Sequence, residues 1–248
     1  MAAATKTQET YVTIPKQNVQ TATIIIEGTS PLVTNPFPNK AAAEIKFKQN
    51  VPVAEQPKKK QYAQRFPWND FANSAYWITP VPTKVLHHEG YPKEGCVVAD
   101  IFSEDDWNNL MAKQPPKFGF QVSGIKESAI TGAYRLGLIK NLPTARMFFN
   151  ITNSVVDTLY KQSVIEIITD KTPIMREDCL STFSSGADMR YRMMFENWKM
   201  ELDISYLADF INIENILYWF SLGGLGVGLG ENRAEKGGPW GSYQVSAG

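Results

Sequence analysis

The residues best suited to chemistry lie between Ser221 and Val245, a glycine-rich stretch that also carries charged side chains. Glycine lets the backbone approach another group closely, and successive N–H groups in such a loop can bind an anion. Arg233 and Lys236 lie in the same stretch and would add cationic contacts to a phosphate. In the alternative, the loop packs on its own sheet and its cations pair with Glu231 and Glu235. Eight of the chain's 17 glycines fall here: Gly223, Gly224, Gly226, Gly228, Gly230, Gly237, Gly238 and Gly241.

The spacing of these glycines excludes the two common nucleotide-binding motifs. The stretch contains neither Gly-x-Gly-x-x-Gly nor Gly-Lys followed by serine or threonine. It is therefore neither a dinucleotide fingerprint nor a P-loop. We instead expect Gly226, Gly228 and Gly230 to contact a phosphate through their backbone, without catalysis.

A second group of cations precedes several aromatic side chains. Between residues 40 and 65, seven lysines and arginines face two glutamates. Cations along a phosphate backbone, beside rings on which bases stack, are typical of proteins that bind single strands. The alternative is a solvated loop, as is usual for a run of charges. The residues that we assign to strand binding here are Lys58, Lys59, Lys60, Arg65 and Trp68.

The net charge of the whole chain is zero, with 25 basic and 25 acidic residues among 248. Composition therefore does not indicate a nucleic-acid binder, and any such role must rest on a local patch. Three more arginines, Arg176, Arg190 and Arg192, complete the candidate contacts. They lie in a polar stretch, residues 170–192, that we expect to be irregular.

Candidate catalytic and metal-binding residues are few. His87 and His88 are adjacent, so on an extended chain they point in opposite directions and cannot chelate one ion. Cys96 and Cys179 are far apart and lie in no metal-binding spacing. We expect a protein that is not an enzyme, with no catalytic residue, metal or cofactor. A weaker alternative is an RNA-processing nuclease that uses His87 or His88.

The elements that must position these residues follow from hydrophobic patterns. Residues 21–27 are rich in β-branched side chains and predict a strand, and three successive isoleucines place it inside a sheet. Residues 29–121 hold eleven prolines, which indicate a long insertion. Within it, Asp105 and Asp106 predict a helix start before Trp107.

Regular patterns return in the second half of the chain. Ser123 is the expected N-cap of an amphipathic helix that ends near Lys140. Residues 146–151 and 163–169 predict two strands, or one strand and its hairpin partner. Residues 198–206 alternate as a strand does. Asn212 then caps a helix that Gly223 and Gly224 end, and the glycine-rich stretch leads to the last strand.

The order strand, helix, strand, strand, helix, strand predicts an α+β protein with a single ferredoxin-like, RRM-like βαββαβ core and an antiparallel sheet. We divide the chain into an N-terminal arm (1–19), the core (20–28 and 123–248) and an insertion after the first strand (29–122). In this arrangement both helices cover one face of the sheet. The open face is a common platform for single-stranded nucleic acid.

A ferredoxin-like core that ends in a helix, a glycine-rich loop and a strand resembles the RAMP superfamily, the RNA-binding subunits of CRISPR effector complexes. The chain is also similar to a family of phage-encoded proteins of unassigned function. That family shares an early Gly-x-x-Pro-Leu, here Gly28 to Leu32, and a late Gly-x-Gly-x-Gly-Glu-x-Arg-x-Glu-Lys-Gly-Gly, here Gly226 to Gly238. The resemblance to the RAMP superfamily implies RNA binding.

The sequence thus predicts a phage protein that binds single-stranded nucleic acid, RNA or DNA, in a repeating homo-oligomeric assembly. The alternative is a phage structural or assembly protein whose arm and insertion contact neighbouring subunits. The N-terminus has no apolar core, and the longest uncharged run, residues 215–230, is broken by glycines and too short to span a bilayer. We therefore expect no membrane partner and a location in the cytoplasm, that of the host for a phage protein.

Overall fold

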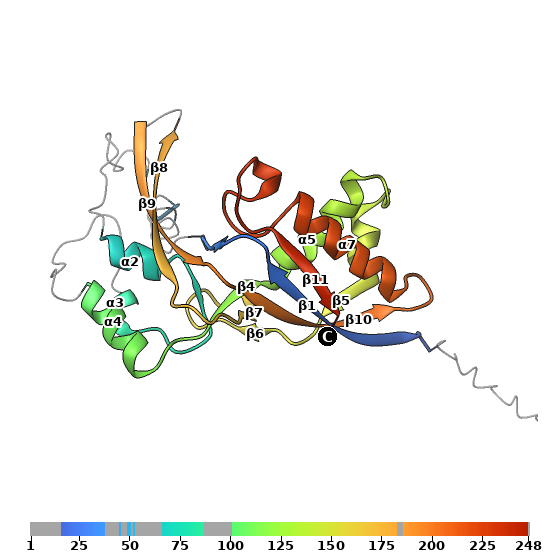
Figure 1. Cartoon of the computed structure of the whole chain (residues 1–248), viewed down its shortest axis with the longest axis horizontal. Coiled ribbons are helices and arrows are strands. Elements are labelled where there is room, and N and C mark those ends of the chain that lie inside the picture. The colour runs from blue at the N-terminus through green and yellow to red at the C-terminus, as the bar shows by residue number, and fades with distance from the viewer. Residues whose placement is uncertain are drawn as a thin grey trace, which may run out of the picture.

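The computed structural model describes residues 16–37, 45, 49–50, 52, 66–86, 101–182 and 186–247. Over these residues the chain is a mixed α+β protein whose strands form three antiparallel sheets (Figure 1). The predicted α+β class is confirmed, but one sheet does not account for all the strands. Most of the expected arm (1–19) and parts of the expected insertion (29–122) lie outside the described residues.

The first sheet unites strands from both ends of the sequence. Its interior strands pair in register, with Ile24 opposite Leu202 and Ile26 opposite Met200, and these four side chains are buried. The strands predicted at 21–27 and 198–206 are confirmed. In spatial order the sheet consists of β11 (Tyr243–Ala247), β1 (Val19–Gly28), β10 (Lys199–Leu207) and β5 (Phe149–Ile151).

Two long helices, α5 (Val122–Arg135) and α7 (Ile213–Gly226), lie together on one side of this sheet (Figure 1). The side chain of Asn212 accepts a hydrogen bond from the Asn215 N–H at 2.9 Å, so the predicted N-cap of α7 is confirmed. The predicted N-cap of α5 is wrong. That helix starts one residue earlier, and Ser123 lies inside its first turn.

Both helices end elsewhere than predicted. Gly223 and Gly224 do not end α7, which continues to Gly226, because both pack against neighbouring backbone. A Cβ on Gly223 would lie 2.7 Å from the Ser128 carbonyl on α5. Helix α5 stops at Arg135, and a separate helix, α6 (Leu142–Phe148), occupies part of the predicted strand at 146–151.

The stretch at 170–192, expected to be irregular, is instead a long antiparallel hairpin of β8 (Ile174–Thr182) and β9 (Gly186–Phe195). The two strands pair with each other along the hairpin, and at its base Met193 and Phe195 are buried in the core. With β2 (Leu32–Val33), which pairs with β9, the hairpin forms the second sheet.

The third sheet explains why residues 146–151 and 163–169 are not hairpin partners. Their strands exist, but β5 pairs with β10 whereas β7 pairs with β4. The order of this sheet is β3 (Tyr76–Trp77), β4 (Phe118–Gln121), β7 (Ser163–Ile167) and β6 (Val155–Val156).

Three short helices accompany the third sheet: α2 (Pro67–Ala72), α3 (Thr83–Leu86) and α4 (Glu104–Lys113). The helix start predicted at Asp105 and Asp106 is confirmed, since Ser103 and Asp106 form a reciprocal capping box. Aromatic rings join these helices to the core, with Phe71 edge-on to Trp107 at 4.9 Å between ring centroids.

Because α5 and α7 are in close contact, alanine substitutions at two glycines of α7 should differ sharply in their effect on stability. Gly223→Ala places a methyl group against the Ser128 backbone and should lower the free energy of unfolding by roughly 1–3 kcal/mol. Gly226→Ala, at the open end of the same helix, meets no atom within 4 Å and should change it little. Urea unfolding measures both, and equal losses would contradict this packing.

Candidate nucleic-acid interface

The β8–β9 hairpin brings together three arginines from its two strands. Its register sets Arg176 opposite Arg192 and Asp178 opposite Arg190. Directly opposed residues of an antiparallel pair point to the same face, so Arg176, Arg190 and Arg192 share one face of the hairpin. We call this the arginine face. The spacing of Arg190 and Arg192, two residues apart, would place them on one face of a strand, but the sequence did not show that these residues lie on a strand.

The base of the arginine face meets the glycine-rich loop, residues 227–242. The Arg176 guanidinium lies over the Trp240 ring, 4.8 Å from its centroid. The Nη2 atom of Arg192 lies 3.7 Å from a Glu231 carboxylate oxygen. Two regions that the sequence analysis treated separately therefore form one surface.

Arg192 is the least solvated of these cations, with 4% of its side chain exposed. Its Nη1 atom donates to Asp178 at 3.4 Å, while Nε and Nη2 have no hydrogen-bond partner among the described residues. Burial lowers the pKa of Arg192, and the nearby carboxylates of Glu231 and Asp178 offset part of that effect. A buried guanidinium with unused donors is costly, and the carboxylates of Asp178 and Glu231 offset part of that cost.

The glycine-rich loop packs against β2, as in the structural alternative. Glu231 donates its N–H to the Val33 carbonyl at 2.9 Å, and Gly241 donates to Pro31 at 2.8 Å. Gly230 has a left-handed φ of +73°, and a Cβ there would lie 2.3 Å from the Val33 oxygen. Glycine at this position thus permits both the turn and the close approach to β2.

The predicted phosphate contacts of the loop differ in their surroundings. The Gly228 N–H already donates to the Gly223 carbonyl at 2.8 Å, and Gly226 is the exposed last residue of α7. A phosphate cradle formed by Gly226, Gly228 and Gly230 therefore stays a prediction, and at Gly228 it would compete with a hydrogen bond within the fold.

Arg233 pairs with Glu235, as in the alternative that we considered. Its Nη2 atom lies 2.7 Å from a carboxylate oxygen, and Nη1 donates to the Gly230 carbonyl at 3.2 Å. Burial raises the pKa of Glu235, but hydrogen bonds and charge from Arg233, with the charge of Arg135, outweigh burial and hold that pKa below its ordinary value. Lys236 is exposed at the end of the short 3-10 helix η3 (Ala234–Lys236).

The remaining candidates do not join this surface in the described structure. Trp68 lies on α2, partly buried, with its ring edge-on to Phe71 at 5.4 Å between centroids. The basic segment and the histidines fall outside the described residues, as does one cysteine: Lys58, Lys59, Lys60, Arg65, His87, His88 and Cys96.

The outer face of the first sheet is a poor platform for stacked bases. Register places Ile25 opposite Glu201 and Glu27 opposite Lys199, on the side away from the buried face of β1 and β10. None of the residues on this face, over the described parts of the four strands, is aromatic. Its charged residues are three carboxylates and one lysine: Glu27, Glu201, Asp203 and Lys199. The expectation that this face binds nucleic acid therefore lacks both rings and positive charge.

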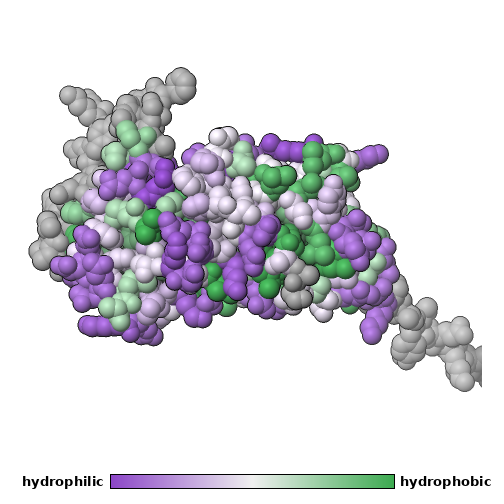
Figure 2. Space-filling view, viewed as in Figure 1, coloured by the Kyte–Doolittle hydropathy of each residue, from purple (hydrophilic) through white to green (hydrophobic). Residues whose placement is uncertain are grey.

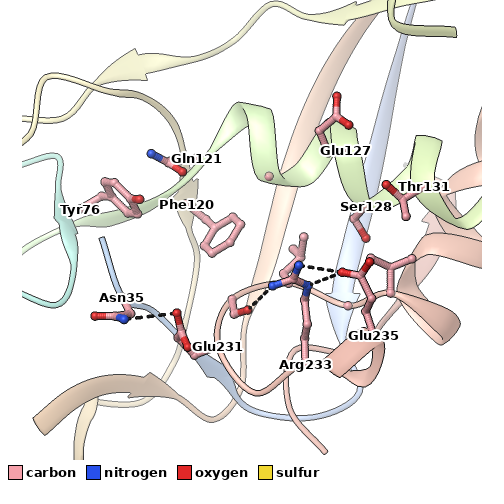
Figure 3. A pocket seen from close by; sticks show the side chains of 15 residues that line it. Asn35, Tyr76, Phe120, Gln121, Glu127, Ser128, Thr131, Glu231, Arg233 and Glu235 are labelled. Carbon is pink, nitrogen blue, oxygen red and sulfur yellow. Dashed lines mark hydrogen bonds and ion pairs between the residues drawn. The ribbon is translucent and has the colours of Figure 1, made fainter. Parts of the chain in front are cut away.

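A pocket of about 240 Å³ lies between the glycine-rich loop, the start of α5 and Tyr76 of β3 (Figure 3). Three of its carboxylates already have cation partners: Glu127 pairs with Arg146, Glu231 with Arg192, and Glu235 with Arg233. Within the described ranges, no group of three or more histidine, cysteine, aspartate or glutamate side chains could hold a metal ion.

Comparison with known proteins adds no relative. No protein-family model matches the chain, and no curated protein matches it at a significant level. Among the described residues, no helix combines the length and the apolar character that a membrane crossing requires.

Alanine substitutions at two glycines with the same backbone conformation test how much stability the contact between the loop and β2 provides. Gly230 and Gly237 have φ values of +73° and +77°, so alanine causes similar left-handed strain at each, on the order of 1–2 kcal/mol. Only at Gly230 would the new methyl group also collide with Val33. Gly230→Ala should therefore lower the melting temperature well beyond Gly237→Ala; equal shifts would mean that the loop does not depend on this contact.

Proposed function

We propose that this protein binds single-stranded nucleic acid without cleaving it, along the arginine face and the adjoining glycine-rich loop. The observation that carries the proposal is the alignment of Arg176, Arg190 and Arg192 on one face of the hairpin, beside the glycine-rich loop. Guanidinium groups match the geometry of phosphate oxygens and bind them in pairs of hydrogen bonds. A strand lying along the hairpin would supply those oxygens.

Local charge supports a phosphate ligand although the whole chain is neutral. Among the residues whose side chains the structure describes, this surface carries six cations and three carboxylates, so positive charge is in excess there. The cations are Arg135, Arg176, Arg190, Arg192, Arg233 and Lys236, and the carboxylates are Asp178, Glu231 and Glu235. Lys58, Lys59, Lys60 and Arg65 lie outside the described residues and stay predicted contacts.

We further propose that β1, α5, β5, β10, α7 and β11 form a ferredoxin-like unit to which the other elements are additions. The sheet order supports this. Numbered along the chain, the four strands of the unit are β1, β5, β10 and β11, and their spatial order in the sheet is fourth, first, third, second. On this view the β8–β9 hairpin is an addition between the second and third strands. The resemblance to RAMP proteins and to the phage-encoded family agrees with such a unit.

Substitution of Arg192 tests the proposed function. Arg192→Met removes the buried charge while Asp178 keeps Arg176 at 2.9 Å and Glu231 keeps Asn35 at 3.2 Å. Because replacing a poorly paired buried ion with an apolar side chain is often neutral or stabilising, the melting temperature should hold or rise. Affinity for a labelled single-stranded oligonucleotide should fall about tenfold or more at low salt, since a charged hydrogen bond contributes ~1.5–3 kcal/mol.

The control is Lys117→Met. It removes one positive charge just before β4 in the third sheet, where Lys117 pairs with Glu166. It should leave affinity nearly unchanged. Wild-type affinity should fall steeply with salt, and Arg192→Met should flatten that slope by about one phosphate contact. Oligonucleotide binding that is absent at low salt, or equal in the two variants, would refute the proposed interface.

A second candidate is a structural or assembly protein, which exposed apolar side chains favour. Tyr218 and Leu225 lie seven residues apart, on one face of α7, and Leu225 is 80% exposed. Phe210 and Met147 are also strongly exposed. Figure 2 shows hydrophobic side chains gathered at the end of the molecule that carries α5 and α7. A surface of this kind favours contact with a second copy of the chain.

Self-association gives a separate prediction. Light scattering at micromolar concentration should detect oligomers of the wild type, and the double variant Tyr218→Lys, Leu225→Lys should be monomeric. Val156→Lys, on an equally exposed valine of β6, should not change the mass. A wild type that stays monomeric with and without oligonucleotide would exclude the homo-oligomer.

A further inference from the structure

The pocket beside the arginine face has a chemical character unlike that of the arginine face. Figure 3 shows the ring of Phe120 and the hydroxyl of Tyr76 directed into it from one side, with Arg233 and Glu235 on the other. Gly124 makes room for the ring, because a Cβ there would lie 3.0 Å from Phe120. The pocket therefore combines an aromatic wall with polar edges.

Tyr76 is the observation that points to a ligand. Only 5% of the residue is exposed, yet its hydroxyl makes no hydrogen bond to any described residue. Burial, with the charge of Asp157, raises its pKa, so the hydroxyl keeps its proton and can donate. The Tyr76 hydroxyl is open to the pocket and can bond to a ligand there, whereas the hydroxyl of the neighbouring Tyr160 is already used, since it donates to the Asn73 carbonyl.

Charge pairing inside the pocket favours a neutral ligand. Glu127, Glu231 and Glu235 line it, and each already pairs with an arginine. Arg233, the cation of the pocket, is held by Glu235. A further anion would meet carboxylates, and a cation would find them already paired. Hydrogen-bonding groups remain at Tyr76, Gln121 and Thr131, whose side chains bond to no described residue.

We infer that the pocket holds one unstacked nucleobase of the strand bound on the arginine face. A base is planar and uncharged, stacks on an aromatic ring, and presents both donors and acceptors at its edge, which matches Phe120, Tyr76 and Gln121. The inference rests on the proposed strand binding. Glu231 links the two sites, because it lines the pocket and also lies 3.7 Å from Arg192.

The size of the pocket suits a small planar ligand. Its volume of about 240 Å³ is below the range of about 300–1,000 Å³ that is usual for drug-sized ligands, which is compatible with one base. Phosphates on the arginine face would position the strand, and this pocket would select among bases.

The test compares an intact oligonucleotide with one of equal length in which every nucleotide is abasic, by fluorescence anisotropy at low salt. The abasic strand keeps all phosphates, and wild-type protein should bind it roughly fivefold or more weakly. Tyr76→Phe, which removes only the unpartnered hydroxyl, should weaken binding of the intact strand roughly three- to tenfold. It should leave binding of the abasic strand and the melting temperature unchanged.

Tyr160→Phe is the matched control, since the two rings lie edge to face at 5.9 Å between centroids. It removes a hydroxyl that is bonded within the fold. It should therefore lower the melting temperature and leave the preference for the intact strand as in the wild type.

The outcomes distinguish a failure of the base pocket from a failure of the proposed strand binding. Equal binding of intact and abasic strands, or a Tyr76→Phe variant that binds the intact strand as wild type does, overturns the base pocket and leaves strand binding standing. Binding of neither strand overturns both. An NMR titration with the four nucleoside 5′-monophosphates adds a last arm: perturbation near Tyr76 by a free nucleotide but not by the oligonucleotide would assign the pocket to a free ligand and refute the inference.

Discussion

The close backbone contact of α7 with α5 and β11 is the constraint on which the candidate site depends. Gly223 lies against the Ser128 backbone, and a Cβ on Gly224 would lie 2.0 Å from the Tyr243 carbonyl oxygen. This contact fixes where α7 ends and where the glycine-rich loop begins. The loop then carries Glu231 toward the hairpin, while α5 presents its first turns to the pocket. Any larger residue at Gly223 or Gly224 would separate these walls.

Charge pairing explains how a neutral chain can still hold an anion-binding surface. Several cations outside the hairpin are paired locally, as Lys84 is with Asp106 and Lys171 with Glu196. At the arginine face the donors of guanidinium groups outnumber nearby carboxylate oxygens, and Arg192 retains two nitrogens without hydrogen bonds to described residues. Such a group costs folding free energy, which makes a ligand a reasonable physical cause for its presence.

The proposed interface divides recognition between two chemistries. Guanidinium groups on a hairpin suit phosphates, which every strand carries, whereas a pocket with an aromatic wall suits a base. The acidic outer face of the first sheet would repel a phosphate backbone, so the route of the strand differs from the open-sheet platform that the element order suggested. This difference comes from Glu27, Glu201 and Asp203, whose position on that face follows from the strand register.

The sequence by itself determined the local elements: the strand at 21–27, the alternating strand at 198–206, the Asn212 cap and the helix start at Asp105. Each depends on a periodicity or a cap that neighbouring residues settle among themselves. Only the tertiary structure decided the ends of α7, the hairpin at 174–195 and the pairing of β5 with β10. Gly223 and Gly224 would end an isolated helix, but packing against Ser128 and Tyr243 overrides that preference. Likewise Arg176 and Arg192 meet only through strand pairing. Tyr76 lies beside the glycine-rich loop although more than 150 residues separate them in the chain. Local sequence does not reveal either contact, because hydrogen bonds between distant strands leave no pattern in neighbouring residues.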